Sequence, residues 1–309
     1  MTSCLIGYTG FVGSNLDQQY SFTDRYNSKN IAEIAGKTYD LCICAGVKAQ
    51  KWVANQQPEH DLSEIKALIN HLKSAKIKQF VLISTIDVYP YPIQVDEDSV
   101  IDRNQHHAYG LNRLYLEEWV AKYYEKHLII RLPGLFGYNI KKNFIYDIMH
   151  PVPMLFNEVF FAQLISKLDH QERLLIEKVY PKSGINYVWD KTNEQAVNDV
   201  LQRYGISSLM FTDAEDVFQY YDLRELKKHI TICLENNIRV VNFASEPVMA
   251  KALYAALFER TFENHLDRPK QNYDMHSKHA ALLGGFKTYL HTKDEIIEQI
   301  RAFIVEQAQ

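Results

Sequence analysis

The sequence predicts an α/β fold with a doubly wound parallel sheet and a smaller C-terminal lobe, and three observations favour it. A short apolar run at residues 4–6 leads directly into three glycines spaced three residues apart. Apolar runs of strand length recur at residues 41–46, 79–85 and 128–132, as the buried strands of a parallel sheet require. Between them, residues 61–76 carry an apolar face at helical spacing. Strands that alternate with helices in this way build a parallel sheet covered on both faces.

Composition bounds the class of protein. The 309 residues are 47% hydrophobic, enough for a large core and two lobes. The net charge of -4 is mixed along the chain, whereas a nucleic-acid-binding surface shows a basic stripe. No apolar run reaches membrane-spanning length, and no basic or apolar leader precedes the first strand. We therefore expect a cytoplasmic protein without a signal peptide and with no nucleic-acid or membrane partner.

The cysteines lie mostly in apolar runs, which indicates buried free thiols in a reducing cytoplasm rather than disulfides. No cluster of further ligands accompanies them, so we expect no metal site. The four residues are Cys4, Cys42, Cys44 and Cys233.

The glycine spacing at Gly7, Gly10 and Gly13 indicates a particular chemistry. The first glycine allows a sharp turn after a strand, the second allows backbone to approach a pyrophosphate, and the third allows close packing of the helix on the sheet. A helix N-terminus then presents N–H groups and a positive dipole end to phosphates. With a strand before it and a helix over residues 11–19 after it, this turn predicts a dinucleotide site in a Rossmann-type sheet.

The expected cofactor contacts follow from this placement. In the glycine turn we expect contacts from Gly7, Thr9, Gly10, Phe11, Val12 and Gly13. Small residues at the end of the strand over residues 41–46 leave room for a cofactor that crosses the sheet, so we also expect contacts from Ala45, Gly46 and Val47. Pro133, which closes the strand over residues 128–132, completes this set.

The second strand, over residues 20–26, decides between the two nicotinamide cofactors. NAD sites of this type usually have an acidic residue at the end of this strand, and the chain has none there. Asn27 and Ser28 could hydrogen-bond a ribose, while Arg25 or Lys29 could pair with a 2′-phosphate. The cofactor is therefore NADP or NAD, and the basic residues favour NADP.

Candidate catalytic groups meet where the strand over residues 79–85 ends. It delivers Ser84, Thr85 and Asp87 to the carboxyl edge, where open α/β sheets bind ligands. A helix follows in which Tyr109 and Arg113 are four residues apart, so both side chains project from one face. A hydroxyl at a strand end that faces a tyrosine–cation pair is a proton-transfer arrangement.

These motifs resemble those of the extended short-chain dehydrogenase/reductases, in the NAD-dependent epimerase/dehydratase group that acts on nucleotide sugars. The resemblance covers most of the chain in the family's order, except for residues from about 140 to 205. It rests on Gly7-x-x-Gly10-x-x-Gly13, residues 84–89 (STIDVY), Tyr109-x-x-x-Arg113, residues 131–137 (RLPGLFG), 218–222 (FQYYD), 240–243 (VVNF) and 273–278 (YDMHSK).

The resemblance implies a role for each matching residue. Thr85 stands where the family hydrogen-bonds the substrate oxygen, and Tyr109 stands on the tyrosine that exchanges a proton with the substrate while hydride moves to or from nicotinamide. Asp87 lies where the sugar dehydratases carry a glutamate, one carbon longer. Ile86 stands where those enzymes place their acid, which argues against dehydration. The implied function is an epimerase or reductase of a sugar nucleotide, and the family habit is compatible with a homodimer.

Arg113 departs from the family, which has lysine there to lower the tyrosine pKa and bind the nicotinamide ribose. Arginine keeps the charge, so a tyrosinate would still be favoured, but its planar fork is not equivalent to an ammonium group. Alternatively, Arg113 pairs only with Glu117 on the next turn. Two rival functions follow: a cofactor-binding protein with little or no catalysis, such as a redox sensor or scaffold partner, and a reductase of a non-nucleotide carbonyl compound.

The domain boundaries follow the same pattern. We expect a dinucleotide-binding domain over residues 1–137, completed by residues from about 206 to 244. A substrate-binding lobe takes residues 138–205 and 245–309. Within it we expect helices near residues 169–178 and 192–204, a helix from residue 246 to 262, and a last helix with an apolar face near residues 296–304. Lys141, Lys142 and Asn143 could meet a substrate phosphate, but we expect the lysines to face water. We expect His276 and His279 to share a helical face without binding metal.

Overall fold

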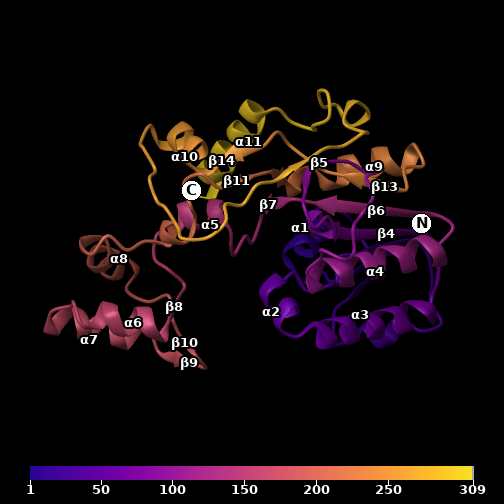
Figure 1. Cartoon of the computed structure of the whole chain (residues 1–309). Helices are drawn as coiled ribbons and strands as arrows, with labels where there is room; N and C mark the ends of the chain where they lie inside the picture. The colour runs from indigo at the N-terminus through magenta and orange to yellow at the C-terminus, as the bar shows by residue number, and fades with distance from the viewer. Residues whose placement is uncertain (308–309) are drawn as a thin grey trace.

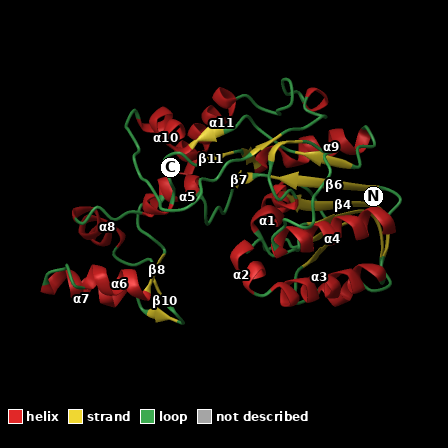
Figure 2. Cartoon of the chain, viewed as in Figure 1, coloured by secondary structure: helices red, strands yellow, loops and turns green. Residues whose placement is uncertain are grey.

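A six-stranded parallel sheet forms the centre of the molecule, as the sequence predicts (Figures 1 and 2). This structure is a computed structural model and describes residues 1–307. The strand order is β13-β6-β4-β3-β1-β2. In chain order these strands are β1 (Ser3–Ile6), β2 (Asp24–Tyr26), β3 (Thr38–Cys44), β4 (Lys76–Thr85), β6 (His127–Leu132) and β13 (Val240–Asn242).

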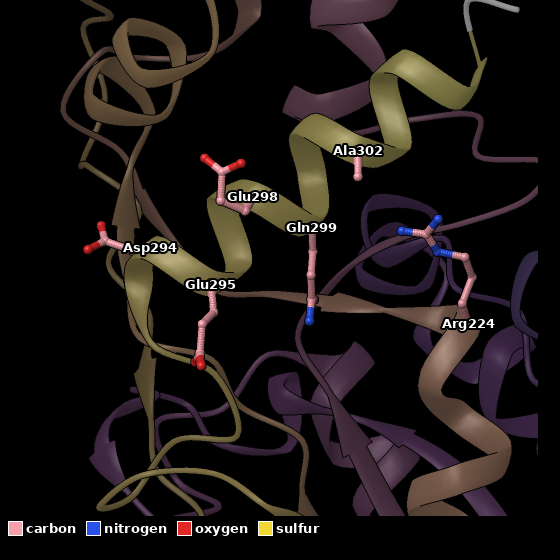
Figure 3. A pocket seen from close by; sticks show the side chains of 6 residues that line it. All are labelled: Arg224, Asp294, Glu295, Glu298, Gln299 and Ala302. Carbon is pink, nitrogen blue, oxygen red and sulfur yellow. The ribbon is translucent and has the colours of Figure 1, made fainter.

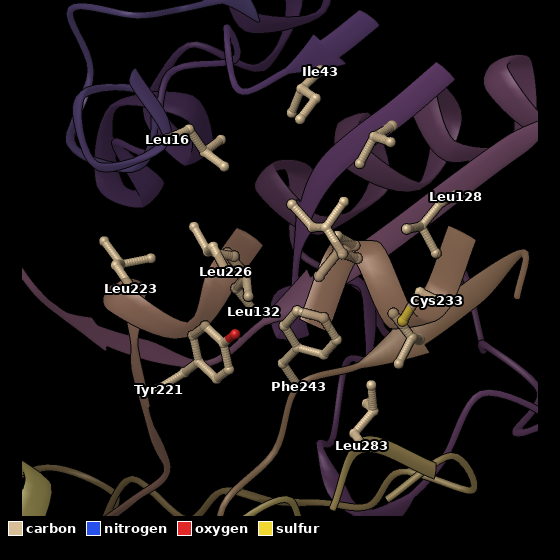
Figure 4. Packing of buried hydrophobic residues seen from close by; sticks show 14 of the residues in the cluster. Leu16, Ile43, Leu128, Leu132, Tyr221, Leu223, Leu226, Cys233, Phe243 and Leu283 are labelled. Atoms are coloured by element: carbon tan, nitrogen blue, oxygen red, sulfur yellow. The ribbon is translucent and has the colours of Figure 1, made fainter. Parts of the chain in front are cut away.

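Helices cover both faces of this sheet. One face carries α1 (Phe11–Gln19) and α9 (Leu226–Glu235), and the other carries α3 (Pro58–Lys73) and α4 (Ala108–Tyr123). Successive strand residues point to opposite faces, so Leu41 and Ile43 pack toward the first pair of helices while the thiols of Cys42 and Cys44 pack toward the second. Figure 4 shows part of the first core, including Leu16, Ile43 and Phe243.

The chain reverses its winding direction at β1, and this reversal positions the site. From β1 the chain passes through α1 to β2 on one side, and β3 then returns to the other side of β1. In open α/β sheets, ligands bind in the crevice outside the carboxyl ends of the strands at such a switch point. The glycine turn after β1 and Ala45, which follows β3, both lie there.

The chain after β6 forms a further hydrophobic core, separate from the two at the faces of the sheet. It joins Phe136 to Phe303, with ring centroids 5.6 Å apart, and takes in Phe144, Tyr220 and Phe262. Its helices are α5 (Phe144–Met149), α10 (Ala250–Phe258) and α11 (Lys293–Gln307). Three strand pairs form separate two-stranded sheets: β7 (Gly134–Phe136) with β12 (Tyr220–Asp222), β11 (Val217–Phe218) with β14 (Val248–Met249), and β5 (Ile93–Val95) with β15 (Asp274–Met275).

Residues 152–206 form a small unit with a hydrophobic core of its own. A three-stranded antiparallel sheet in the order β8-β10-β9 packs with three helices, and Figure 1 shows this unit projecting from the rest of the chain. Its elements are β8 (Leu155–Asn157), α6 (Glu158–Ile165), α7 (His170–Val179), β9 (Lys182–Ser183), β10 (Asn186–Val188) and α8 (Glu194–Arg203).

The remaining regular elements are short. They are α2 (Lys51–Gln56) and the 3-10 helices η1 (Ile31–Ile34), η2 (Ile86–Val88), η3 (Ser208–Phe211), η4 (Leu223–Glu225) and η5 (Ala281–Leu283). Within residues 1–307, no helix has both the length and the apolar character needed to cross a membrane.

Three expectations about local structure were wrong. The strand expected over residues 20–26 is confined to Asp24–Tyr26. The helix expected from residue 246 begins at Ala250, because Val248 and Met249 first pair with β11. His276 and His279 do not share a helical face: His276 directly follows β15, and its ring packs edge-on against Tyr289.

Candidate active site at the carboxyl edge of the sheet

The glycine turn is shaped by close backbone packing. Gly7 has a φ of +87°, and a Cβ at this position would lie 2.4 Å from the carbonyl oxygen of Ala45. A Cβ on Gly13 would lie 2.0 Å from the carbonyl oxygen of Gly7. By contrast, a Cβ on Gly10 would approach that same oxygen at 3.2 Å. Gly7 and Gly13 are therefore required by packing, whereas Gly10 leaves room above the turn.

The N-terminus of α1 is open to a ligand. Gly10 is the N-cap residue, and no side chain among residues 1–307 caps its N–H groups. Thr9 and Gly10 are exposed, and Phe11 and Val12 are half-buried. The first N–H groups of α1 are uncapped, and the adjoining turn consists of glycines that allow close backbone approach. This arrangement fits the pyrophosphate of a dinucleotide.

The region expected to hold the adenosine ribose is already hydrogen-bonded. The side-chain amide of Asn27 donates to the Tyr8 hydroxyl at 3.2 Å, and its side-chain oxygen accepts from the Lys29 N–H at 2.9 Å. Arg25 donates from Nε to Asp17 at 2.5 Å, which turns its charge toward α1. Ser28 and Lys29 are exposed, so Lys29 is the basic side chain that remains available to a 2′-phosphate.

The other expected cofactor residues lie at neighbouring strand ends. Ala45 donates from its N–H to the Ile6 carbonyl at 2.8 Å, which continues the pairing of β1 and β3, and Gly46 and Val47 follow it. A Cβ on Gly46 would lie 2.8 Å from the Ile6 side chain. Pro133 follows β6 and is half-buried.

Thr85, Asp87 and Tyr109 are brought together by the packing of α4 on η2. Gly110 makes this possible, since a Cβ there would lie 2.2 Å from the Asp87 carbonyl oxygen. The Thr85 hydroxyl accepts from the Asp87 N–H at 3.2 Å and so caps η2. At the start of α4, His107 accepts from the Gly110 N–H at 3.0 Å, as expected of a capping residue.

The phenol of Tyr109 has a raised pKa, which corrects the expected preference for tyrosinate. Burial is the main cause, because only 6% of Tyr109 is exposed. Asp87 raises the pKa further, whereas the positive charge of Arg113, the Thr85 side chain and the charge of Lys51 lower it. Burial outweighs these opposing effects, so the neutral phenol is the favoured form.

Arg113 is committed to a buried ion pair across the helix layer. Its guanidinium carbon lies 3.9 Å from the centroid of the Tyr109 ring. Both terminal nitrogens donate to the Asp61 carboxylate on α3, one of them at 2.9 Å, and Nη2 also donates to the Lys48 carbonyl oxygen at 2.5 Å. The alternative pairing with Glu117 is wrong.

Glu117 instead pairs with Arg131 on β6 at 2.7 Å. The Ser84 hydroxyl donates to the same carboxylate at 2.5 Å. Ser84 is therefore turned toward this buried pair, away from the role that its place at the strand end suggested.

Sequence reasoning missed three residues that complete the site. Asn55 accepts from the backbone N–H of Tyr109 at 2.9 Å, Asp61 holds Arg113, and Lys51 pairs with Asp87 at 2.6 Å. All three lie 36–54 residues from their partners in sequence, so no local spacing marked them. The one available signal was a polar stretch directly after a strand that ends at the ligand edge.

Other features of the described residues do not form part of this site. All four cysteines are free and buried. Among residues 1–307, no group of three or more His, Cys, Asp or Glu could hold a metal ion. A shallow hollow runs along α11, where Figure 3 shows Arg224 facing the helix. Its lining residues are Arg224, Asp294, Glu295, Glu298, Gln299 and Ala302.

The fold matches known structures over its full length. A dTDP-4-dehydrorhamnose reductase from Clostridium acetobutylicum aligns with a TM-score of 0.60 at 13% identity over 100% of both chains. A UDP-glucose 4-epimerase from Thermotoga maritima, solved with UDP-glucose, gives the same values. RMD from Pseudomonas aeruginosa, solved with NADPH, aligns with a TM-score of 0.63 at 15% identity over 99% of this chain and 98% of that chain. No protein-family model and no curated protein sequence matches the chain. The chain shares the fold of these three proteins.

Proposed function

We propose that the chain is a member of the extended short-chain dehydrogenase/reductases and an NAD(P)-dependent epimerase or reductase of a sugar nucleotide. The observation that carries the proposal is the meeting of Thr85 and Tyr109 at the carboxyl edge of β4, in a sheet whose first turn fits a dinucleotide. A bound nicotinamide would supply or accept the hydride. The similar folds of enzymes that act on sugar nucleotides support the substrate class.

The roles of the residues follow from their surroundings. Tyr109 holds the proton that is exchanged with the substrate oxygen, and Thr85 orients that oxygen by hydrogen bonding. Arg113, stacked on the Tyr109 ring, stabilises the charge of the phenolate when it forms. The N–H groups at the start of α1 hold the cofactor pyrophosphate, and Lys29 favours the 2′-phosphate of NADP over the free hydroxyl of NAD.

The first test is whether the protein holds a nicotinamide cofactor. Mass spectrometry of small molecules that copurify with the protein should reveal NADP or NAD and, where bound, a sugar nucleotide. Calorimetric titration with each cofactor should then give binding, tighter for NADP. If the protein bound neither NADP nor NAD, the proposal would lose its basis.

The second test addresses the chemistry. Positioned acid–base groups contribute roughly 10²–10⁴ in rate. Tyr109→Phe should therefore lower turnover by about that factor while cofactor affinity stays nearly unchanged. The matched control is Tyr115→Phe, which removes the hydroxyl group of a 40% exposed tyrosine on the same helix. Equal turnover of Tyr109→Phe and the control would exclude Tyr109 as the proton donor.

One observation favours a second candidate, an NAD(P)-binding protein with little or no catalysis. The guanidinium of Arg113 is hydrogen-bonded to Asp61 and to the Lys48 carbonyl oxygen, and the pKa of the Tyr109 phenol is raised. Inactivity toward a panel of sugar nucleotides, combined with tight cofactor binding, would favour this role as a sensor or scaffold partner. A gain in turnover in Arg113→Lys would instead mark an enzyme weakened by the arginine.

A further inference from the structure

A short segment beside the site, residues 48–51, is held by three cationic side chains. Arg113 donates to the carbonyl oxygen of Lys48 at 2.5 Å, and Lys142 donates from Nζ to the carbonyl oxygen of Ala49 at 2.7 Å. At the end of the segment, Lys51 pairs through Nζ with Asp87 Oδ1 at 2.6 Å. The segment is therefore fixed both to α4 and to the turn that carries Thr85.

The fork of Arg113 is what makes this anchoring possible. Its two terminal nitrogens bind both oxygens of Asp61, and one of them reaches the Lys48 carbonyl as well. The single ammonium group of a lysine cannot offer this planar set of donors. Because Arg113 is 4% exposed and bound on several sides, its charge has a fixed position.

Lys51 is a cation of a different kind. Its side chain is 41% exposed and lies on the short helix α2, while Asp87 is 18% exposed. Asp87 belongs to η2, the turn capped by Thr85, and Gly110 brings that turn against α4 next to Tyr109. Asn55, one turn further along α2, accepts from the Tyr109 N–H at 2.9 Å, so the Lys51–Asp87 pair carries one charge of each sign on the two short elements that contact α4 at Tyr109 and Gly110.

We propose that Lys51 and Asp87 set the ionisation of Tyr109 as a pair: the Lys51 ammonium group offsets the Asp87 carboxylate, which would otherwise disfavour the phenolate more strongly. The proposal rests on Tyr109 as the acid–base group of the proposed function. It assigns to Lys51, presented by a segment that Arg113 anchors, part of the charge stabilisation at this site. The charges of Lys51 and Asp87 act on the Tyr109 pKa in opposite directions.

The other charged and titratable groups near Tyr109 lie on α4, α3 and the ends of β4 and β6. Arg113 and His107 lie on α4 itself and at its N-cap, and the pKa of His107 is lowered mainly by burial. Asp61 lies on α3 and is neutralised by Arg113. Thr85 at the end of β4 is uncharged. On β6, Arg131 is paired with Glu117. Lys51 and Asp87 are thus the pair whose charges can be removed without breaking a buried ion pair.

The test measures ionisation of Tyr109 directly and does not require turnover. The protein is labelled with 3-fluorotyrosine, whose fluorine lowers the phenol pKa into an accessible range, and the Tyr109 resonance is assigned by its absence in Tyr109→Phe. The ¹⁹F shift is then followed against pH in the wild type, Lys51→Met and Asp87→Asn. Lys48→Met is the matched control, because Lys48 pairs with Glu64 at 2.5 Å and contributes only its backbone to the Arg113 contact.

The expected shifts have opposite signs. Lys51→Met should raise the pKa of Tyr109, because a bare Asp87 carboxylate then faces the phenol, and Asp87→Asn should lower it. Lys48→Met should leave it unchanged. Equal midpoints in Lys51→Met and Lys48→Met, or a raised midpoint in Asp87→Asn, would overturn the proposal.

A second readout separates this inference from the proposed function. If the protein turns over a sugar nucleotide, the Tyr109 limb of the pH profile of kcat should move in the same directions as the ¹⁹F midpoints. If the Tyr109 limb of the kcat profile stayed at the same pH in these variants, the proposal would be contradicted. If the midpoints move as expected and no substrate is turned over, the electrostatic arrangement stands and the proposed enzyme activity fails.

Discussion

Replacing Gly13 by alanine tests whether the first turn has the close packing that a dinucleotide site requires. The added Cβ would lie 2.0 Å from the Gly7 carbonyl oxygen, 2.6 Å from its carbon and 3.0 Å from the Cα of Tyr8. All three atoms belong to backbone, so no side chain can rotate away. Ordinary contact begins near 3.4 Å, and the turn must therefore move by more than an ångström or lose its shape.

The size of the effect follows from this overlap. Overpacking a tight interior costs about 1–3 kcal/mol and occasionally more, and a backbone overlap belongs at the upper end. For a chain of 309 residues the unfolding entropy is roughly 0.65 kcal/mol/K, so 1 kcal/mol corresponds to about 1.5 °C in Tm. Gly13→Ala should therefore lower the Tm by roughly 4–5 °C. The displaced turn should also lose its affinity for both nicotinamide cofactors.

Gly10→Ala is the control that separates packing from binding. Its Cβ would approach the Gly7 oxygen at 3.2 Å, which needs a movement of a few tenths of an ångström. Gly10→Ala should keep the Tm within about 2 °C of the wild type, yet weaken NADPH binding because the methyl group projects above the turn. Thermal unfolding followed by circular dichroism gives the Tm, and calorimetry gives the Kd. A Gly13→Ala protein with wild-type Tm and Kd would refute the described geometry of the turn.

Three further predictions concern buried charges. Asp61→Asn leaves Arg113 buried without its anion and should destabilise the fold by roughly 3–5 kcal/mol in urea unfolding. Asp40→Asn, which breaks a solvent-screened pair with Lys78, should cost much less, and similar losses in the two variants would contradict the buried pair. Burial lowers the pKa of His229 from 6.5 to about 4, so the unfolded chain binds the extra proton first and stability falls as pH drops through this window. About 3 kcal/mol should be lost by pH 4, and His229→Phe should remove this part of the pH dependence of urea unfolding; an unchanged dependence would refute it. Burial raises the pKa of Asp147 from 3.8 to about 7, so the native state holds its proton longer than the unfolded chain and stability falls as pH rises across that range. Asp147→Asn should therefore raise the Tm at pH 8 and leave it nearly unchanged at pH 4, and equal shifts at both pH values would speak against a titrating carboxyl group.

The sequence predicted the features that short-range sterics determine. The spacing of Gly7, Gly10 and Gly13 indicates a turn because Gly7 and Gly13 are required by close backbone packing and Gly10 leaves room above the turn. The four-residue spacing of Tyr109 and Arg113 places both on one face of α4, and the guanidinium does stack on the phenol ring. In both cases the relevant neighbours are close in sequence or fixed by the period of the helix.

The partners of the charged residues could not be predicted in this way. Helical spacing suggested Glu117 for Arg113, but Arg131 on the adjacent strand takes Glu117, and Asp61 on α3 takes Arg113. Such pairs form where the three-dimensional packing brings opposite charges together, and a pattern read along one helix does not contain that information. The helix start at Ala250 was missed for a similar reason, because Val248 and Met249 pair with β11 and so cannot belong to the helix.

The protonation state of Tyr109 connects the burial of the site to the direction of its chemistry. A phenol whose pKa is raised by burial holds its proton near neutral pH, so it is ready to donate that proton to an oxygen and poorly suited to abstract one. Reduction of a carbonyl needs such a donor as hydride arrives, whereas an epimerase that begins by oxidising an alcohol needs a base in the same place. Arg113 and Lys51 reduce this bias, and Asp87 adds to it. Within the proposed function, the balance of these groups favours the reductase over the epimerase.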